Sequence, residues 1–429
     1  MSLGFEQAGF DVAAAVEIDP VHCAVHKFNF PNTAVIPLSV ESLNAAIIRK
    51  AAGIGDAQVD CVFGGAPCQG FSLIGHRVLN DPRNKLVLDF VRIVSELKAK
   101  TFVFENVKGL TVGKHKKFLK ELVAAFDEAG YEVRQPWKVL NAGNYGTPQF
   151  RERLILFGCR KGEKLPDYPA PTSNLPGRKS VQDYLRNGPT CADALGDLPD
   201  ADRFQTLLDS DCVKTSAYAE PSSYAAELRC MNNDAWHFGY VRDWNPSYLT
   251  SSARTGHTDI SRRRFRETAP GEVEPISRFF KLSETGVSNT LRAGTDGARG
   301  AFTSPRPIHY RHDRCITVRE MARLHGFPDW FRFHVTKWHG ARQIGNAVPP
   351  PLARAIAREV IIALGIEPTR PRAPISLGDD SLLAFDLSGA AAHFGIDAMP
   401  SRRDRKSGAT KRKQIEIERE RLAGHEAYG

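Results

Sequence analysis

The first 160 residues alternate between short apolar stretches and longer segments of helical periodicity, and this alternation restricts the fold more than any other feature. Strands are predicted at AAAVEI, CVFGG, TFVFENV, EVRQPWKVLNA and RLILFGC, and helices at 21–29, 86–99 and 115–129. Strands that alternate with helices are typical of a doubly wound α/β sheet. The sequence therefore predicts an α/β domain over residues 1–160.

The chain changes character after this domain. Residues 161–290 are rich in Pro, Gly, Ser, Asn and Arg, and they predict a smaller, irregular second domain. Helical periodicity returns within 291–366, and the last helix there is expected to return to the first domain. Residues 367–429 are predicted to form a basic tail or linker, either solvated or weakly bound to DNA.

Composition excludes several classes of protein. The eight cysteines form no CxxC pair and no cluster with zinc spacing, so we expect a reducing compartment and no metal site. No apolar run reaches the length of a membrane span and no signal peptide is visible, so a cytoplasmic, membrane-free protein is predicted. The net charge of +9 is compatible with a polyanionic partner.

The stretch CVFGGAPCQGFS carries the first candidate for chemistry. A buried strand runs into Gly64 and Gly65 and then into Cys68, at the place where open α/β sheets form their sites. A cysteine on such a loop can be exposed and reactive. A buried structural cysteine is an equally good explanation of this local pattern alone.

Two further stretches end or begin strands with polar residues. TFVFENV delivers Glu105 to the same predicted edge, where a carboxylate can bind or protonate a ring nitrogen. In PQFRER, Arg151 and Arg153 alternate with period two and are predicted to point to one face as oxygen-directed donors. A surface glutamate and a solvated strand are the alternatives for these two stretches.

Together and in this order, these stretches resemble the motifs of the cytosine-C5 DNA methyltransferases. GGAPCQGFS is similar to the nucleophile motif, ENV to the glutamate motif and PQFRER to the arginine motif. VEIDP, DPRNKL, TVREMARLHGFPDWF and QIGNAVPPPLARAIA resemble further motifs, so the resemblance covers about residues 1–365. It implies a Rossmann-like fold that binds S-adenosyl-L-methionine, with residues 161–290 as a target-recognition domain.

The resemblance also implies a mechanism in which a cytosine is flipped out of duplex DNA into a pocket. Cys68 would attack ring carbon 6, because carbon 5 is a poor nucleophile until a thiolate has added beside it. Glu105 would hold and protonate N3, and Arg153, with Arg151 behind it, would bind the carbonyl O2. The methyl group would then be transferred to carbon 5.

Six residues are expected at the cofactor by the same resemblance. Glu17 matches the carboxylate that binds the ribose hydroxyls, with Ile18 beside it. Ser39 stands where the family places an acidic residue for the adenine amino group, so adenine recognition is expected to be weaker or to use another residue. Pro67 shapes the turn between cofactor and base, and Asn346 and Val348 are expected to close over the cofactor.

Double-stranded DNA is the partner that the resemblance implies. Ser72 and Arg77 in the catalytic loop, Arg254, Arg262 and Arg264 in the recognition domain, and Thr290 at its end are predicted DNA contacts. A solvated surface arginine is the alternative for each of the three recognition-domain arginines. The protein is further expected to be a nucleoid-associated monomer with a cognate restriction endonuclease in the same system.

The opening MSLGFEQAGF departs from the family pattern. Family members place a strand and a Gly-rich turn before the segment that LGFEQAGF resembles, so both are expected to be absent here. A misassigned or truncated start, a degenerate copy, and a circular permutation in which 379–397 supplies the strand are the three explanations. An inactive DNA-binding homologue and an RNA cytosine methyltransferase accordingly remain as alternative functions.

Overall fold

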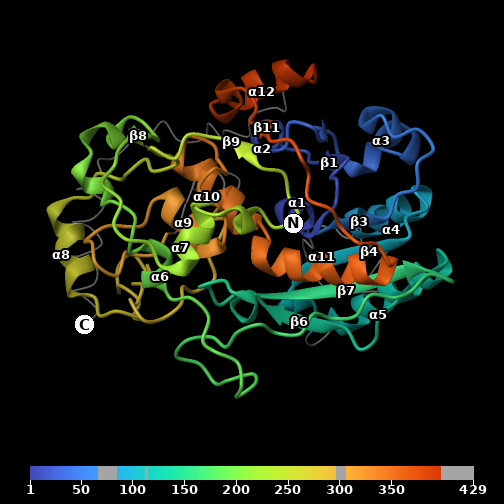
Figure 1. Ribbon diagram of the computed structural model, residues 1–429, viewed down its shortest axis with the longest axis horizontal. Coiled ribbons are helices and arrows are strands. Elements are labelled where there is room, and N and C mark those ends of the chain that lie inside the picture. The colour runs from blue at the N-terminus through green and yellow to red at the C-terminus, as the bar shows by residue number, and fades with distance from the viewer. Residues whose placement is uncertain (66–84, 112–114, 296–305, 398–429) are drawn as a thin grey trace, which may run out of the picture.

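The computed structural model describes residues 1–65, 85–111, 115–295 and 306–397 (Figure 1). Its larger sheet has the strand order β3-β4-β7-β5, with β6 paired to the other part of β7. These strands are β3 (Cys61–Gly64), β4 (Thr101–Val107), β5 (Tyr131–Val133), β6 (Lys138–Asn141) and β7 (Glu152–Arg160). β3 and β4 are parallel and β7 is antiparallel to β4, so the sheet is mixed.

Helices cover both faces of this sheet (Figure 1). α1 (Ser2–Ala8) and α11 (Pro350–Leu364) pack on one face, and α4 (Lys85–Glu96) and α5 (His115–Glu128) pack on the other. Successive side chains of β4 point to opposite faces of the sheet. Val103 packs in the core beneath α1 and α11, whereas Phe102 and Phe104 pack in the core beneath α4 and α5. α1 and α11 cross very closely, because a Cβ on Gly4 would lie 2.5 Å from that of Ala353.

A second parallel pair, β1 (Ala14–Val16) and β2 (Ala34–Ile36), lies beside the larger sheet. Asp19 caps α2 (Pro20–Asn29), accepting a hydrogen bond from the Val21 backbone N–H at 3.0 Å, and Pro20 occupies the first helical turn. α3 (Ala45–Ala52) follows β2. Within the described ranges, no ladder joins this pair to the five-stranded sheet.

The predicted elements of this domain are confirmed apart from one. EVRQPWKVLNA forms two strands, β5 and β6, which pair with different parts of β7. The prediction of a single strand was wrong because Pro136 cannot donate to a ladder, and the chain turns at 134–137.

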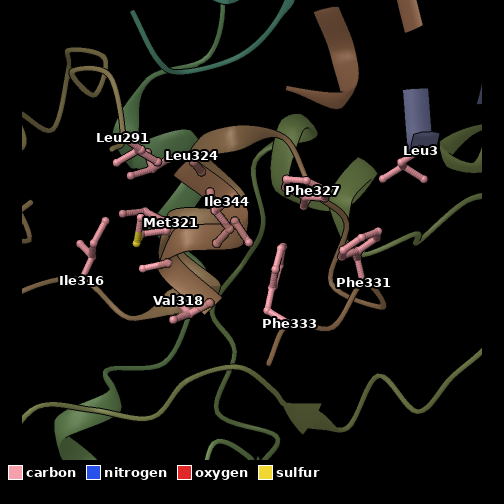
Figure 2. Close-up of a cluster of buried hydrophobic side chains, with 14 of the residues drawn as sticks. Leu3, Leu291, Ile316, Val318, Met321, Leu324, Phe327, Phe331, Phe333 and Ile344 are labelled. Carbon is pink, nitrogen blue, oxygen red and sulfur yellow. The ribbon is translucent and has the colours of Figure 1, made fainter. Parts of the chain in front are cut away.

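Residues from 161 onward form short elements linked by irregular chain. Apart from 3₁₀ turns, those described before α11 are α6 (Cys191–Leu195), β8 (Val213–Lys214), α7 (Ser223–Leu228), β9 (Arg242–Asp243), β10 (Tyr248–Leu249), α8 (Asp259–Glu267), α9 (Val318–His325) and α10 (Lys337–Asn346). Figure 2 shows α9 at the centre of a buried cluster that includes Met321, Leu324, Phe327 and Ile344. α9 and α10 thus share a core with α6, while α11 packs on the sheet.

The chain after α11 is not a solvated tail over residues 375–394, which corrects the expectation for this segment. β11 (Ile375–Ser376) pairs in parallel with β9, and α12 (Leu387–Phe394) packs on α2 (Figure 1). Leu382 and Leu383 are buried with Phe28, so burial of apolar surface holds the segment in place. The permutation explanation is also wrong, because 379–397 forms a 3₁₀ turn and a helix and no strand.

No helix of the described chain is both long enough and apolar enough to cross a membrane.

Candidate active site

Glu105 and Arg153 meet on one face of the sheet. The antiparallel register pairs Glu105 with Ile155 and Val107 with Arg153, so the two charged side chains are diagonal neighbours. The Arg153 Nε lies 2.7 Å from the Glu105 Oε1, and the two side chains are 13% and 14% exposed. The pair is therefore largely withdrawn from water.

Burial dominates the electrostatics of this pair. Burial raises the pKa of Glu105 above its ordinary value, and the nearby Arg153 and Arg151 oppose the shift. Burial also lowers the pKa of Arg153, against the attraction of Glu105. A carboxyl group with a raised pKa is better able to hold a proton for delivery to a base.

The end of β3 lies directly against Glu105. A Cβ on Gly65 would be 2.6 Å from the Glu105 Oε2 and 3.1 Å from its backbone oxygen, so only glycine fits here without moving the carboxylate. β3 and β4 are parallel, and their carboxyl ends therefore open on the same edge. Cys68, Pro67, Ser72 and Arg77 lie outside the described residues.

Arg151 is placed differently from the expectation of a paired oxygen donor. It is 1% exposed and donates to the backbone oxygens of Leu291 at 2.9 Å, Gly345 at 2.7 Å and Ala347 at 2.9 Å. Burial lowers its pKa to about 9, with a further contribution from Arg153. Arg151 therefore joins chain segments, and Arg153 alone contacts Glu105.

The predicted cofactor residues near the N-terminus gather at the carboxyl ends of β1 and β2. Glu17 is exposed, and its Oε1 accepts a hydrogen bond from the Asp19 backbone N–H at 3.1 Å. Ile18, next to Glu17, is 47% exposed. Ser39 caps the following 3₁₀ turn, η1 (Val40–Ser42), through a bond from the Glu41 backbone N–H.

Asn346 and Val348 differ in accessibility. Asn346 is exposed at the end of α10, whereas Val348 is 4% exposed and packs in the core with Phe5 and Leu352. Asn346 is therefore the more accessible member of this predicted pair, and Val348 presents little side-chain surface.

The predicted DNA-contacting arginines are occupied by the protein itself. Arg254 and Arg262 both pair with Asp202, at 3.5 and 2.7 Å, and Arg254 also donates to the Phe204 backbone oxygen. Arg264 is 12% exposed and lies 3.6 Å from Glu274. These contacts favour a structural role for the three side chains in the free protein.

Thr290 also has an internal partner. Its hydroxyl donates to the Phe150 backbone oxygen at 2.7 Å, which fastens the end of the recognition region to the entrance of β7.

The sequence did not identify two residues that contact the site or the segments around it. The sequence indicates Gly65 only as part of a turn, because its close approach to Glu105 depends on tertiary packing. His325 is fully buried and contacts Gln149 and Ala347, more than 170 residues away in the first case. In the sequence, His325 is simply the residue before Gly326, which ends the helix, and nothing in that pattern predicts its partners.

Comparison with known proteins agrees with this geometry. Residues 1–362 match the C-5 cytosine-specific DNA methylase family. The chain is 56% identical over 398 residues to the type II methyltransferase M.XorII of Xanthomonas oryzae pv. oryzae, covering 93% of this chain and 90% of that protein. It is 32% identical to the type II methyltransferase M1.HphI of Haemophilus parahaemolyticus, covering 84% of this chain and 83% of the other.

A solved structure is similar as well. It is a prophage-encoded protein from E. coli described as a DNA modification methyltransferase, and it is 30% identical with a TM-score of 0.65. The match covers 85% of this chain and 96% of the other, so the sheet and its helices are those of a methyltransferase fold.

Proposed function

Because the chain belongs to the C-5 cytosine-specific DNA methylase family and is a DNA (cytosine-5) methyltransferase, we propose that it acts through Cys68, Glu105 and Arg153. The observation that carries this proposal is the Glu105–Arg153 ion pair at the edge where β3 leads toward Cys68. A nucleophile, a proton donor and an oxygen-directed cation at one strand edge are the groups that addition to a pyrimidine ring requires.

In the proposed reaction, the Cys68 thiolate forms a bond to carbon 6 of a flipped-out cytosine. The ring electrons shift toward N3, which takes a proton from Glu105, and Arg153 stabilises the charge at O2. Carbon 5 becomes nucleophilic and would take a methyl group from a sulfonium donor, whose methyl–sulfur bond would break so that the donor leaves as a neutral thioether. N3 then returns its proton, a base removes the carbon 5 proton, and the carbon–sulfur bond breaks to release the thiolate.

S-adenosyl-L-methionine is the proposed cofactor, and when bound it supplies an electrophilic methyl group. The exposed Glu17 carboxylate suits the ribose hydroxyls, and the exposed Ile18 suits a flat apolar ring. Asn346 is available on the opposite segment, whereas Pro67 would approach from the loop. Ser39 offers a hydroxyl instead of a carboxylate, so adenine recognition through its amino group is weak here.

The finer architecture is also part of the proposal. β1 and β3 are not hydrogen-bonded to one another in the described chain, and this supports a further parallel strand with a Gly-rich turn between them. Such a strand would present its turn to the cofactor beside Glu17.

The substrate is proposed to be a specific duplex DNA sequence, read by residues 161–290. Because the two similar proteins are named type II methyltransferases, we place this one in a restriction–modification system with a cognate endonuclease. The protein acts as a nucleoid-associated monomer in this proposal.

The test is methyl transfer from labelled S-adenosylmethionine to duplex DNA, with Cys68→Ser and Glu105→Gln variants beside the parent. We expect transfer by the parent, none by Cys68→Ser, and a loss of about 10²-fold or more in Glu105→Gln, the range of a removed general acid. A parallel arm with tRNA separates RNA methylation. DNA binding by the parent without transfer or cofactor affinity would instead support an inactive homologue.

A further inference from the structure

A buried hydrogen-bond network joins the entrance of β7 to α9 and to the end of α10. The His325 Nδ1 lies 2.9 Å from the Gln149 Nε2, and its Nε2 lies 3.0 Å from the Ala347 backbone oxygen. Both Gln149 and His325 are fully buried. Both ring nitrogens of His325 and both polar atoms of the Gln149 amide have partners, and buried polar groups that are satisfied in this way rigidify a core.

The contacts determine the tautomer of His325. A backbone oxygen can only accept, so the Nε2 must carry the hydrogen, and the Nδ1 must accept one from the Gln149 amide. The Gln149 oxygen is then free to accept from the Leu291 backbone N–H, which lies 3.2 Å away. The two assignments agree, so the network has one consistent proton arrangement with a neutral His325.

Arg151 closes the network from the other side. It donates to the Leu291, Gly345 and Ala347 oxygens, so the Ala347 oxygen accepts from both His325 and Arg151. The backbone segments are closely packed here, because a Cβ on Gly345 would lie 2.3 Å from the Ala293 backbone nitrogen. Burial and the nearby Arg151 hold the pKa of His325 well below its usual range.

The three joined segments flank the groups of the proposed reaction. Arg153 lies two residues after Arg151, Asn346 lies between the two held carbonyls of Gly345 and Ala347, and Thr290 precedes Leu291. We propose that His325 is a positioning residue that holds the segment of Asn346, which faces the cofactor, against the strand that carries Arg153. This inference rests on the proposed function. Movement of one segment is then transmitted to the other.

The test compares His325→Gln with His325→Met. Glutamine can donate to Ala347 and accept from Gln149, whereas methionine fills a similar space but cannot donate. His334→Met is the matched control, because His334 is also buried and its Nε2 lies 3.0 Å from a backbone oxygen, that of Phe385.

We expect His325→Met to raise KM for S-adenosylmethionine about tenfold, the factor for one lost buried hydrogen bond. His325→Gln should restore it, and His334→Met should lower thermal stability while leaving KM near the parental value. Equal KM in parent and His325→Met would overturn the proposal.

A second readout is independent of activity. Nitrogen-15 NMR of the full chain should show His325 as the neutral Nε2–H tautomer between pH 6 and 8, and a protonated ring or the other tautomer would contradict the network. A parent that transfers no methyl group would count against the proposed function, whereas an active parent with an unaffected His325→Met counts against the positioning role.

Discussion

The contact between Gly65 and Glu105 leads to a prediction that separates catalysis from folding. An alanine Cβ at position 65 would lie 2.6 Å from the Glu105 Oε2, whereas ordinary contact begins at 3.4 Å. The carboxylate must therefore move by 3.4 − 2.6 = 0.8 Å. The Cβ would also lie 3.1 Å from the Glu105 backbone oxygen, and moving the carboxylate weakens its largely buried ion pair with Arg153, so the substitution also costs some stability.

The same displacement is costly for the reaction. Glu105 is held by Arg153 at 2.7 Å, and a shift of nearly 1 Å separates it from both its partner and the ring nitrogen it serves. Misplacement on this scale costs about 10²-fold in rate, or roughly 2.7 kcal/mol of transition-state stabilisation. We therefore expect Gly65→Ala to reduce kcat about 100-fold and to lower the free energy of unfolding by about 1–3 kcal/mol, which leaves a folded protein whose turnover can be measured.

Gly64→Ala is the matched control, because among the described residues a Cβ there would meet only the Phe90 ring, at 3.4 Å. The assay is single-turnover methyl transfer at saturating DNA and cofactor, with urea unfolding of each variant. Parental turnover in Gly65→Ala would refute the reasoning, as would an equal loss of turnover in Gly64→Ala.

Three further predictions concern stability and DNA binding. His325 is neutral when folded and its pKa is lowered, so the unfolded chain binds the extra proton. The free energy of unfolding should fall as pH drops below about 6.5, and His325→Gln should remove about 1.4 kcal/mol per pH unit from that slope in urea titrations. Arg254→Ala should lower the melting temperature without changing the salt dependence of DNA binding, because Arg254 is bonded within the protein. Arg263 is exposed, and if it contacts a phosphate, Arg263→Ala should reduce the slope of log binding constant against log salt concentration by about 1. Leu383→Ala should cost about 2–4 kcal/mol in calorimetry because this side chain is 1% exposed against α2, and no loss would show that the segment after α11 contributes nothing to the fold.

Local sequence was sufficient for most of the α/β domain. β4 and β7 are long apolar strands with partners on both faces, and Asp19-Pro20 is a strong helix start, so periodicity and capping chemistry identify them. The segment 375–394 was not predictable in this way. Its short helix is stabilised by burial against α2, a contact between residues more than 350 positions apart.

The recognition region shows the same limit for charged residues. Arg254, Arg262 and Arg264 are residues of a type that often contacts DNA. Arg254 and Arg262 nevertheless pair with Asp202, more than 50 positions away, and Arg264 lies near Glu274, ten positions along the chain. Charge alone cannot distinguish a solvated arginine from a paired one, because the difference lies in the geometry of partners that are not neighbours in sequence.

The sequence by itself determined the family resemblance, the order of the motifs and the edge at which Glu105 ends its strand, because these depend on local pattern. Only the tertiary structure decided that Arg153 pairs with Glu105 while Arg151 holds three backbone carbonyls. Period-two spacing places both arginines on one face, but burial and the position of Leu291, Gly345 and Ala347 decide which guanidinium finds a carboxylate. Those positions are brought together by packing across the whole chain, which no local pattern encodes.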